Sequence, residues 1–385
     1  MQAVIDRIIR IYNEEENDPR PALTRSDIPQ RWESVTTNWL TQVICTPSSA
    51  AEVTSFRFGP RDDGTSNRRR IHLTYNDAGN QIGLPATVFC KASIGLENRI
   101  ALGTMGCSHA ESTFYSKARP QLDIEAPRAY LANYDPESFA AIAVLEDLGG
   151  KVHFCDEDTH FDHARAAGQV DTLAALHSRF HDDPRLATPE LPFERWSTWF
   201  RNLEVAIQME TYCNKGFLAA RDVIPPRLYQ RAAEIWPATL RAVAQHARLP
   251  ATLLHADAHA KNWYYVLDDG RMGLGDWQAC VVGHWSRDYA YTVASSLRIE
   301  ERRAWEPGLL SRYLERLAAG GVDPPSFENA LTYYRQQLFA GLSYWTITLT
   351  PAPNMPVMQP EKTTIEIIRR ITHAIDDLEA LDSFD

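Results

Sequence analysis

The sequence predicts an α+β protein in which a β-rich part over residues 51–147 is followed by a mainly helical part over residues 148–385. Three observations lead to this prediction. Runs of alternating apolar residues, typical of half-buried strands, are concentrated in the first part. Runs with apolar residues three and four positions apart, typical of amphipathic helices, fill most of the second part. A strand–loop–strand segment rich in polar side chains, over residues 253–278, interrupts those helices.

A helical extension is expected before the first strand, over residues 1–50. In its first helix, over residues 1–16, apolar side chains recur at helical spacing, at Val4, Ile5, Ile8, Ile9 and Tyr12. A second helix, carrying Trp32 and Trp39, is expected to begin after the capping sequence at residues 26–29.

The β-rich part is expected to hold five strands, at residues 51–58, 70–75, 85–93, 128–134 and 139–145. The third strand ends near Lys91, and a helix that opens at Ser108 is expected to follow it. Glu111 stands three residues after Ser108, so the pair also fits a capping box within its own helix. A lysine near a strand end is most often a solvated charge. Lys91 and Glu111 by themselves therefore identify no site.

The mainly helical part is expected to contain helices at residues 161–180, 193–220, 226–247, 286–299, 301–319, 326–349 and 361–381. Large aromatic side chains are frequent on the helices before the polar segment, at Trp196, Trp199, Phe200, Tyr212 and Trp236. Such stripes usually belong to the core, although some of these helices are expected to cover a substrate. His177 lies beside an apolar stripe and is expected to be a packed core histidine.

The composition is that of a globular protein that can bury a core, with 44% hydrophobic and 23% charged residues. The formal net charge of −11 argues against nucleic-acid binding, which depends on clustered Lys and Arg. The six cysteines include no C-x-x-C pair, which favours reduced thiols over a disulfide frame or a zinc site. No apolar run is long enough to span a membrane, and the charged N-terminal residues do not fit a signal peptide. The expected location is the cytoplasm, with no nucleic-acid or membrane partner.

The polar segment holds three residues suited to phosphoryl transfer. Asp257 and Asn262 lie between two predicted strands, and a turn at residues 268–270 begins a hairpin that leads back to Asp276. We expect the loop and the hairpin to gather these three side chains at one end of a small sheet. Phosphoryl transfer requires a carboxylate that orients the attacking hydroxyl and oxygen ligands that hold Mg²⁺ on the phosphates.

The spacing His255-x-Asp257-x-x-x-x-Asn262, followed by Asp276, resembles the signature of aminoglycoside and choline kinase-like phosphotransferases. The Asp-Trp-Gln sequence that begins at Asp276, together with residues 283–291, is most similar to the ecdysteroid-kinase-like branch. The resemblance implies a protein-kinase-like bilobal fold. It also implies an ATP- and Mg²⁺-dependent enzyme that moves the γ-phosphate to a hydroxyl of a small molecule.

The same resemblance implies roles for the candidate site residues. Asp257 is expected to be the catalytic base, and Asn262 and Asp276 are expected to bind the metal ion and the nucleotide. Lys91 corresponds to the lysine that grips the α- and β-phosphates of the nucleotide. Glu111 is expected to form an ion pair with Lys91, because the family places an acid on the helix after the lysine strand.

Other residues are expected to support the site. His255 is expected to anchor the catalytic loop by hydrogen bonding, and His259 to have a structural part in it. Asp288 is expected to be a buried brace for the loop. Glu146 and Leu148 fall in the link between the two lobes, where the backbone is expected to hydrogen-bond the adenine.

The acceptor is expected to be a small molecule and not a protein. Between Asp276 and Asp288 there is no room for the long activation segment with which protein kinases dock peptides. In addition, no arginine precedes Asp257, as it does in many protein kinases. The branch resemblance and the many aromatic residues favour a hydrophobic alcohol or natural product. The acidic net charge leaves an aminoglycoside or a choline-like cation open.

Two other classes of function also fit the residues. The loop over residues 59–67 stands where a kinase has its glycine-rich loop but lacks G-x-G-x-x-G, which would suit a binding protein on a catalytically dead kinase scaffold. Alternatively, His255, Asp257 and His259 on an extended segment would place three metal-competent side chains on one face, as in a metal-dependent hydrolase. The hydrolase reading leaves Asn262 and Asp276 unexplained.

Overall fold

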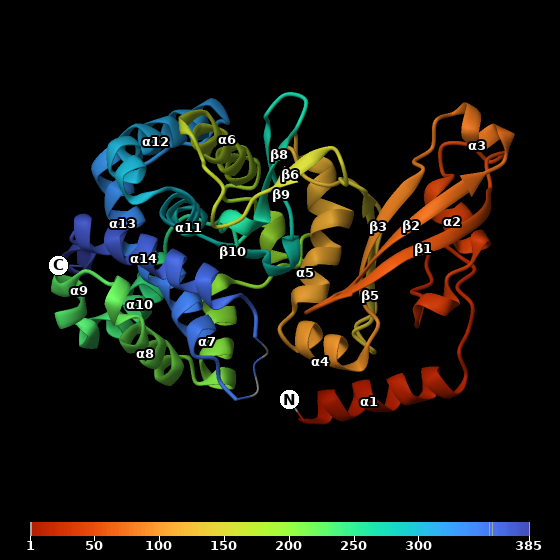
Figure 1. Ribbon diagram of the computed structural model, residues 1–385, viewed down its shortest axis with the longest axis horizontal. Coiled ribbons are helices and arrows are strands. Elements are labelled where there is room, and N and C mark those ends of the chain that lie inside the picture. The colour runs from red at the N-terminus through yellow and green to blue at the C-terminus, as the bar shows by residue number, and fades with distance from the viewer. Residues whose placement is uncertain (1, 354, 356, 385) are drawn as a thin grey trace. The chain divides into compact units, whose positions relative to one another are not determined.

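The computed structural model describes residues 2–353, 355 and 357–384, and the chain forms two compact units (Figure 1). The first unit comprises Met1–Gln121, Ala126–Gly150 and Asp276–Ala279. The second comprises Leu122–Glu125, Lys151–Gly275 and Cys280–Asp385. After Gly150 the chain therefore returns to the first unit only for the short segment Asp276–Ala279. The division into a helical extension and two lobes at residues 50 and 147 stays a prediction.

A five-stranded antiparallel sheet forms the body of the first unit, in the order β1-β2-β3-β5-β4. Its strands are β1 (Val53–Asp63), β2 (Asn67–Tyr75), β3 (Thr87–Ser93), β4 (Ala129–Tyr134) and β5 (Ala141–Glu146). The five predicted strands are confirmed, and the alternation predicted for β2 buries Ile71, Leu73 and Tyr75. Lys91 lies on the central strand β3, opposite Arg68 of β2 and Ala143 of β5.

The helices of the first unit are α1 (Gln2–Asn17), α2 (Thr37–Ile44), α3 (Asp77–Gln81), α4 (Leu96–Thr104) and α5 (Cys107–Thr113). The prediction of one helix from residue 29 through Trp32 and Trp39 is wrong. Trp32 lies in a separate 3-10 turn, and α2 begins after Thr36, whose side chain accepts a hydrogen bond from the Trp39 N–H. Asp27, in the expected cap, instead accepts the backbone N–H groups of two earlier residues, Leu23 and Thr24.

The second unit is mainly helical, as predicted. Its helices are α6 (His163–Arg179), α7 (Trp196–Ile207), α8 (Met209–Ala219), α9 (Pro226–Gln230), α10 (Ala232–His246), α11 (Ser286–Ser296), α12 (Ile299–Ala319), α13 (Phe327–Leu349) and α14 (Glu361–Asp377). Two predicted helices are each broken in two. Gln208 adopts a left-handed backbone conformation (φ 51°) between α7 and α8, and α9 ends at Gln230, two residues before α10. A left-handed residue cannot continue a right-handed helix.

The strands of the second unit belong to two small sheets, which corrects the prediction of one. β7 (Thr252–Leu254) pairs with β10 (Val281–Gly283). β8 (Trp263–Val266) forms the predicted hairpin with β9 (Met272–Leu274) and also pairs with β6 (Val152–Phe154). The loop from residue 255 to residue 262 therefore starts in one sheet and ends in the other.

Helix α11 is the centre of the second unit. Each of its residues is buried, and it packs against α6, α13 and α14. Tyr289 of α11 and three aromatic side chains outside it, Trp285, Tyr313 and Tyr334, are nearly inaccessible to solvent. The six cysteines are all free and buried, which fits the expected reduced thiols. Among the described residues, no helix is long and apolar enough to cross a membrane.

Two buried histidines face each other beside the N-terminus of α11. The rings of His246 and His284 are 5.3 Å apart, and both lie within hydrogen-bonding distance of the Ser286 hydroxyl. Burial lowers the pKa of His246 to about 4, although the hydrogen bond with Gln336 opposes this shift. Burial and the neighbouring His246 likewise lower the pKa of His284 well below its ordinary value.

These histidines are expected to make the fold sensitive to acid. The unfolded chain binds a proton at each histidine below about pH 6.5, whereas the folded protein does not bind it at His246 until about pH 4. The contribution of neutral His246 to the unfolding free energy is therefore complete above about pH 6.5 and is lost as the pH falls towards 4. Between pH 6.5 and 4.5, we expect the unfolding free energy of the wild type to fall by about 2–3 kcal/mol more than that of the His246→Gln variant.

Urea unfolding at a series of pH values measures this difference. The matched control is His153→Gln, because His153 is exposed on β6 and its replacement should leave the pH dependence of the wild type. Parallel pH dependences for the wild type and His246→Gln would show that His246 is not buried in its neutral form.

Candidate active site

The loop between β7 and β8 begins with a backbone conformation that alanine rarely adopts. Ala256, directly before Asp257, has a φ of 64°. Asp276, which follows β9, has a φ of 59°. The left-handed region costs a residue with a side chain about 1–2 kcal/mol, so surrounding contacts must hold both residues in place.

Asp288 holds the start of this loop. Its carboxylate is inaccessible to solvent and accepts hydrogen bonds from the backbone N–H groups of His255 (2.7 Å) and Ala256 (2.9 Å). The ring of His177 lies 3.3 Å from the same carboxylate and 2.7 Å from the Tyr313 hydroxyl. Burial alone would raise the pKa of Asp288, but His177 and nearby positive charge hold it below its ordinary value. The structure thus confirms the buried position of Asp288 and the core position of His177.

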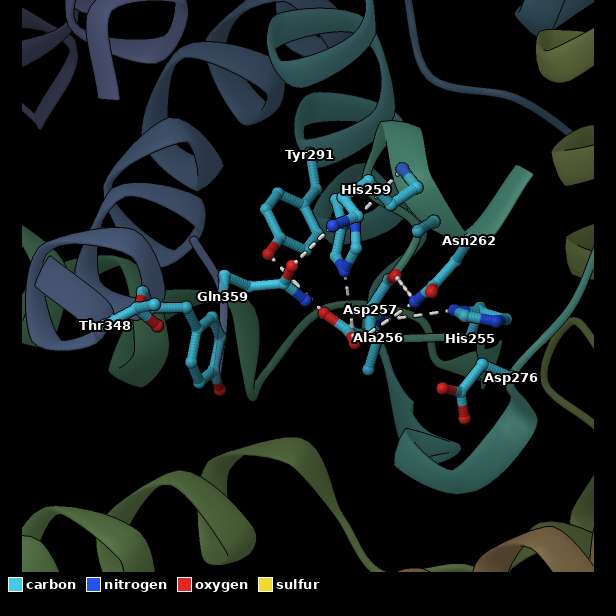
Figure 2. A network of polar contacts seen from close by, with 12 residues as sticks. His255, Ala256, Asp257, His259, Asn262, Asp276, Tyr291, Thr348 and Gln359 are labelled. Atoms are coloured by element: carbon cyan, nitrogen blue, oxygen red, sulfur yellow. Dashed lines mark hydrogen bonds and ion pairs between the residues drawn. The ribbon is translucent and has the colours of Figure 1, made fainter. Parts of the chain in front are cut away.

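Asp257 is surrounded by polar groups but keeps a partly exposed side chain (Figure 2). The amide nitrogen of Asn262 donates to its backbone oxygen (2.7 Å) and to its carboxylate (3.2 Å). The hydroxyl of Tyr291 donates to the other carboxylate oxygen, Oδ1, at 3.5 Å. The Nε2 of His259 lies 3.6 Å from Oδ2, the oxygen that Asn262 contacts. The side chain of Asp257 is 34% exposed, so the carboxylate is oriented and can still meet a ligand.

His255 connects the loop to the end of β9. Its Nδ1 accepts the backbone N–H of Asp257 (3.2 Å), and its Nε2 therefore donates to the backbone oxygen of Gly275 (2.9 Å). The N–H of Gly275 in turn donates to the backbone oxygen of Asn262 (2.8 Å). The expected anchoring contact of His255 is therefore present. Its partner, Gly275, directly precedes Asp276 in the chain.

The segment from His255 to His259 is not extended, which contradicts the geometry of a hydrolase site with three metal ligands. The left-handed residue Ala256 breaks the period of two, and both ring nitrogens of His255 already take part in backbone hydrogen bonds. Within residues 2–353, 355 and 357–384, no three His, Cys, Asp or Glu side chains are grouped so that they could hold a metal ion.

In the first unit, Lys91 bridges two carboxylates. Its ammonium group lies 2.8 Å from Glu111 of α5 and 2.6 Å from Asp276, and only 8% of the residue is exposed. Burial would lower the pKa of Lys91, but the charges of Asp276 and Glu111 outweigh it and raise the pKa above its ordinary value. The predicted Lys91–Glu111 ion pair is therefore confirmed. The capping-box alternative is wrong, because α5 begins after Gly106 with φ 75° and Ser108 already lies inside the helix.

No sequence pattern indicated the aromatic stack that positions Asp276 beside Lys91. Trp277 is fully buried, and its ring lies parallel to that of Phe114 at a centroid distance of 3.8 Å. Phe114 follows α5 directly, three residues after Glu111. The Phe114–Trp277 stack therefore helps to position both carboxylate partners of Lys91. Phe114 directly follows helix α5, which carries Glu111, and Trp277 directly follows Asp276.

The other residues proposed for nucleotide binding are less constrained. Leu148 is buried, and Glu146 ends β5. Between them, Asp147 forms an ion pair with Arg70 (2.5 Å) and accepts the Gly149 N–H. The 59–67 segment is mostly strand, because β1 extends to Asp63 and β2 already begins at Asn67. The side chain of Asn67 accepts the backbone N–H groups of residues 94 and 95.

Several residues near Asp257 had no predicted role. Arg287 and Tyr291 are one turn apart on α11, and the Arg287 guanidinium lies 4.7 Å from the centre of the Tyr291 ring. The side chain of Lys261 donates to Gln359, which precedes α14, at 2.9 Å. An (i, i+4) spacing indicates that Arg287 and Tyr291 share one face of the helix. Only the fold shows that this face meets the loop.

Comparison with known proteins gives one family. The model of the phosphotransferase enzyme family matches residues 101–325, which is more than half of the chain. A search of the curated proteins finds no match to this sequence.

Solved structures with a similar fold include kinases of small molecules. A candidate aminoglycoside phosphotransferase from Ralstonia eutropha has 13% identity and a TM-score of 0.51, over 89% of this chain and 96% of that chain. An ethanolamine kinase from Plasmodium vivax has 11% identity and a TM-score of 0.49, over 93% and 92%. An amicoumacin kinase in complex with AMP-PNP and Ca²⁺ has 12% identity and a TM-score of 0.49, over 84% and 88%. At this identity, the first of these likenesses supports a shared fold and nothing more specific.

Proposed function

Because the chain belongs to the phosphotransferase enzyme family and is a small-molecule kinase, we propose that it transfers the γ-phosphate of ATP to a hydroxyl group. The proposed acceptor is a small, uncharged molecule with an apolar surface. The likeness to the ecdysteroid-kinase-like branch points in the same direction and stays a prediction.

The observation that carries this proposal is the environment of Asp257. A partly exposed carboxylate in a loop braced by Asp288 and oriented by Asn262 and Tyr291 suits a group that accepts the proton of an attacking hydroxyl. The amide nitrogen of Asn262 is used as a donor, which leaves its amide oxygen for a cation. His259 lies against Asp257 and, in the proposal, helps to hold it in place.

The residues proposed for the nucleotide supply matching chemistry. Lys91 carries a positive charge for the phosphates, and its pairing with Glu111 keeps that charge in a fixed position. Asp276 and Asn262 offer the carboxylate and amide oxygens that Mg²⁺ prefers. When bound, the metal ion would neutralise charge on the phosphate oxygens. In the proposal the backbone from Glu146 to Leu148 contacts the adenine.

Arg287 favours an uncharged acceptor over a choline-like or aminoglycoside cation. Its guanidinium already faces three aromatic rings near the catalytic loop, those of Trp196, Tyr291 and Tyr344. Aromatic faces are the usual means of holding an ammonium group, and here a positive charge of the protein occupies them. Trp199, which stacks near Trp196, is only partly buried and offers apolar surface.

The test is an ATP-consumption screen with three sets of acceptors: uncharged apolar alcohols, aminoglycosides, and amino alcohols such as choline and ethanolamine. We expect transfer to an uncharged alcohol that requires Mg²⁺ and is absent in the Asp257→Asn variant. Preferential transfer to amino alcohols or aminoglycosides would overturn the acceptor class. ATP binding without transfer to any of the three sets would support the inactive-scaffold reading.

A further inference from the structure

We propose that Arg287 is a positioning residue for Asp257, and that it acts by holding the left-handed peptide of Ala256. This inference depends on the proposed role of Asp257 as the base. It concerns a residue outside the signature His255-x-Asp257-x-x-x-x-Asn262, on a different element of the fold.

The contact that carries the inference is a hydrogen bond to the backbone. The Nη2 of Arg287 donates to the carbonyl oxygen of Ala256 at 3.0 Å. This carbonyl belongs to the peptide that links Ala256 to Asp257. The N–H of Ala256 is held at the same time by the carboxylate of Asp288 at 2.9 Å. Two consecutive residues of α11 therefore fix both peptide groups of Ala256.

A fixed peptide is needed here because Ala256 is not a glycine. Its φ of 64° brings the Cβ atom close to its own backbone, and an alanine released from its contacts would leave this region. Rotation at Ala256 would change the direction in which Asp257 leaves the loop. Displacement of a catalytic group by about 1 Å can lower a rate by about a hundredfold.

Arg287 is surrounded by aromatic rings and not held by an ion pair. The residue is inaccessible to solvent, and among the described residues no carboxylate lies within ion-pair distance of its guanidinium. Aromatic rings from three helices surround it instead: Trp196 of α7 at 4.9 Å, Tyr291 of α11 at 4.7 Å and Tyr344 of α13 at 5.1 Å. A buried charge is costly unless its environment compensates it. The hydrogen bond to Ala256 is the directional contact of this side chain with the catalytic loop.

Tyr291 gives Arg287 a second route to Asp257. The phenol ring faces the guanidinium, and the hydroxyl of the same residue donates to the Asp257 carboxylate at 3.5 Å. Arg287 thus restrains Asp257 through the preceding peptide and through the side chain that hydrogen-bonds it. Removing the guanidinium removes its hydrogen bond to Ala256 and its contact with the Tyr291 ring at the same time.

The test is a comparison of Arg287→Met, Ala256→Gly and the double variant, each measured per folded molecule by circular dichroism and active protein concentration. We expect Arg287→Met to lower kcat by about 30–100-fold while KM for ATP and for the acceptor changes by less than about threefold. Glycine adopts a positive φ without strain. Ala256→Gly in the Arg287→Met background should therefore raise kcat at least about tenfold.

The matched control is Arg302→Met. Arg302 is equally buried, on α12, but it pairs with Glu306 and Asp377 and does not contact the catalytic loop. Its replacement should lower stability and leave kcat per folded molecule at the wild-type value. If Arg287→Met does not fold, Arg287→Lys is compared in the same way, with an expected loss of about tenfold and the same rescue by Ala256→Gly.

Two results would overturn the inference while Asp257→Asn remains inactive. One is a kcat of Arg287→Met, or of the lysine variant in its place, within about threefold of the wild type. The other is a double variant no more active than the single Arg287 variant. An active Asp257→Asn enzyme would instead remove the proposed role of Asp257, so the two failures are distinguishable.

Discussion

Replacing Asp257 with asparagine is expected to lower kcat by about 10²–10⁴-fold while ATP binding is retained, because a general base contributes rate enhancement of this size. Asparagine has nearly the same shape: its single amide oxygen can still accept the hydrogen bond of Asn262, and its NH2 group can donate to the hydroxyl oxygen of Tyr291. It cannot accept the proton of the acceptor hydroxyl. The loop should therefore keep its conformation while the reaction loses its base. Initial rates at saturating ATP, with ATP affinity from calorimetry, measure the two quantities separately.

Asp269→Asn is the matched control for this prediction. Asp269 lies in the turn of the β8–β9 hairpin, where it is exposed and hydrogen-bonds to Arg271. The same change of charge at this position should leave kcat unaffected. A fully active Asp257→Asn enzyme, or an equal loss in both variants, would contradict the role of Asp257.

Replacing Lys91 with methionine is expected to abolish nucleotide binding and to destabilise the fold by about 3–5 kcal/mol, the usual cost of leaving one member of a buried ion pair alone. Glu111 has a side chain that is only 11% exposed, and without Lys91 it would face Asp276 with no cation between them. Urea unfolding and calorimetric titration with ATP and Mg²⁺ measure the two effects.

A second substitution separates stability from function. In Lys91→Met with Glu111→Gln, no buried charge is left alone at position 111, so most of the unfolding free energy should return while nucleotide binding stays absent. Lys215→Met, at an exposed position of α8, controls for the loss of a lysine in general. If Lys91→Met binds ATP as tightly as the wild type, Lys91 does not hold the phosphates.

The sequence was most informative where local pattern and fold agree. The alternation of Ile71, Leu73 and Tyr75 predicted β2, and the spacing of Asp257 and Asn262 identified the loop. The second predicted helix failed because two capping signals compete. Asp27 closes a turn before the expected start, and the hydroxyl of Thr36 caps the true one. Apolar periodicity continues through Gln208, so it could not reveal the left-handed residue that divides α7 from α8.

Residues that act through tertiary contact were beyond sequence reasoning. The choice between a capping box and an ion pair for Glu111 depended on where α5 lies relative to β3, which no local pattern contains. Likewise, nothing in the sequence around Arg287 indicates that its guanidinium ends at the carbonyl of Ala256, 31 positions earlier. Such contacts are set by how α11 packs under the loop.

The return of the chain to the first unit limits how this protein can be dissected. A fragment that stops at Gly150 contains the whole five-stranded sheet but lacks Asp276 and Trp277. In such a fragment Lys91 would keep one acidic neighbour out of two, and the face of Phe114 that Trp277 covers would be open to water. The first unit therefore cannot be obtained by a single cut. An isolated version would need the residues from Asp276 to Ala279 grafted back in.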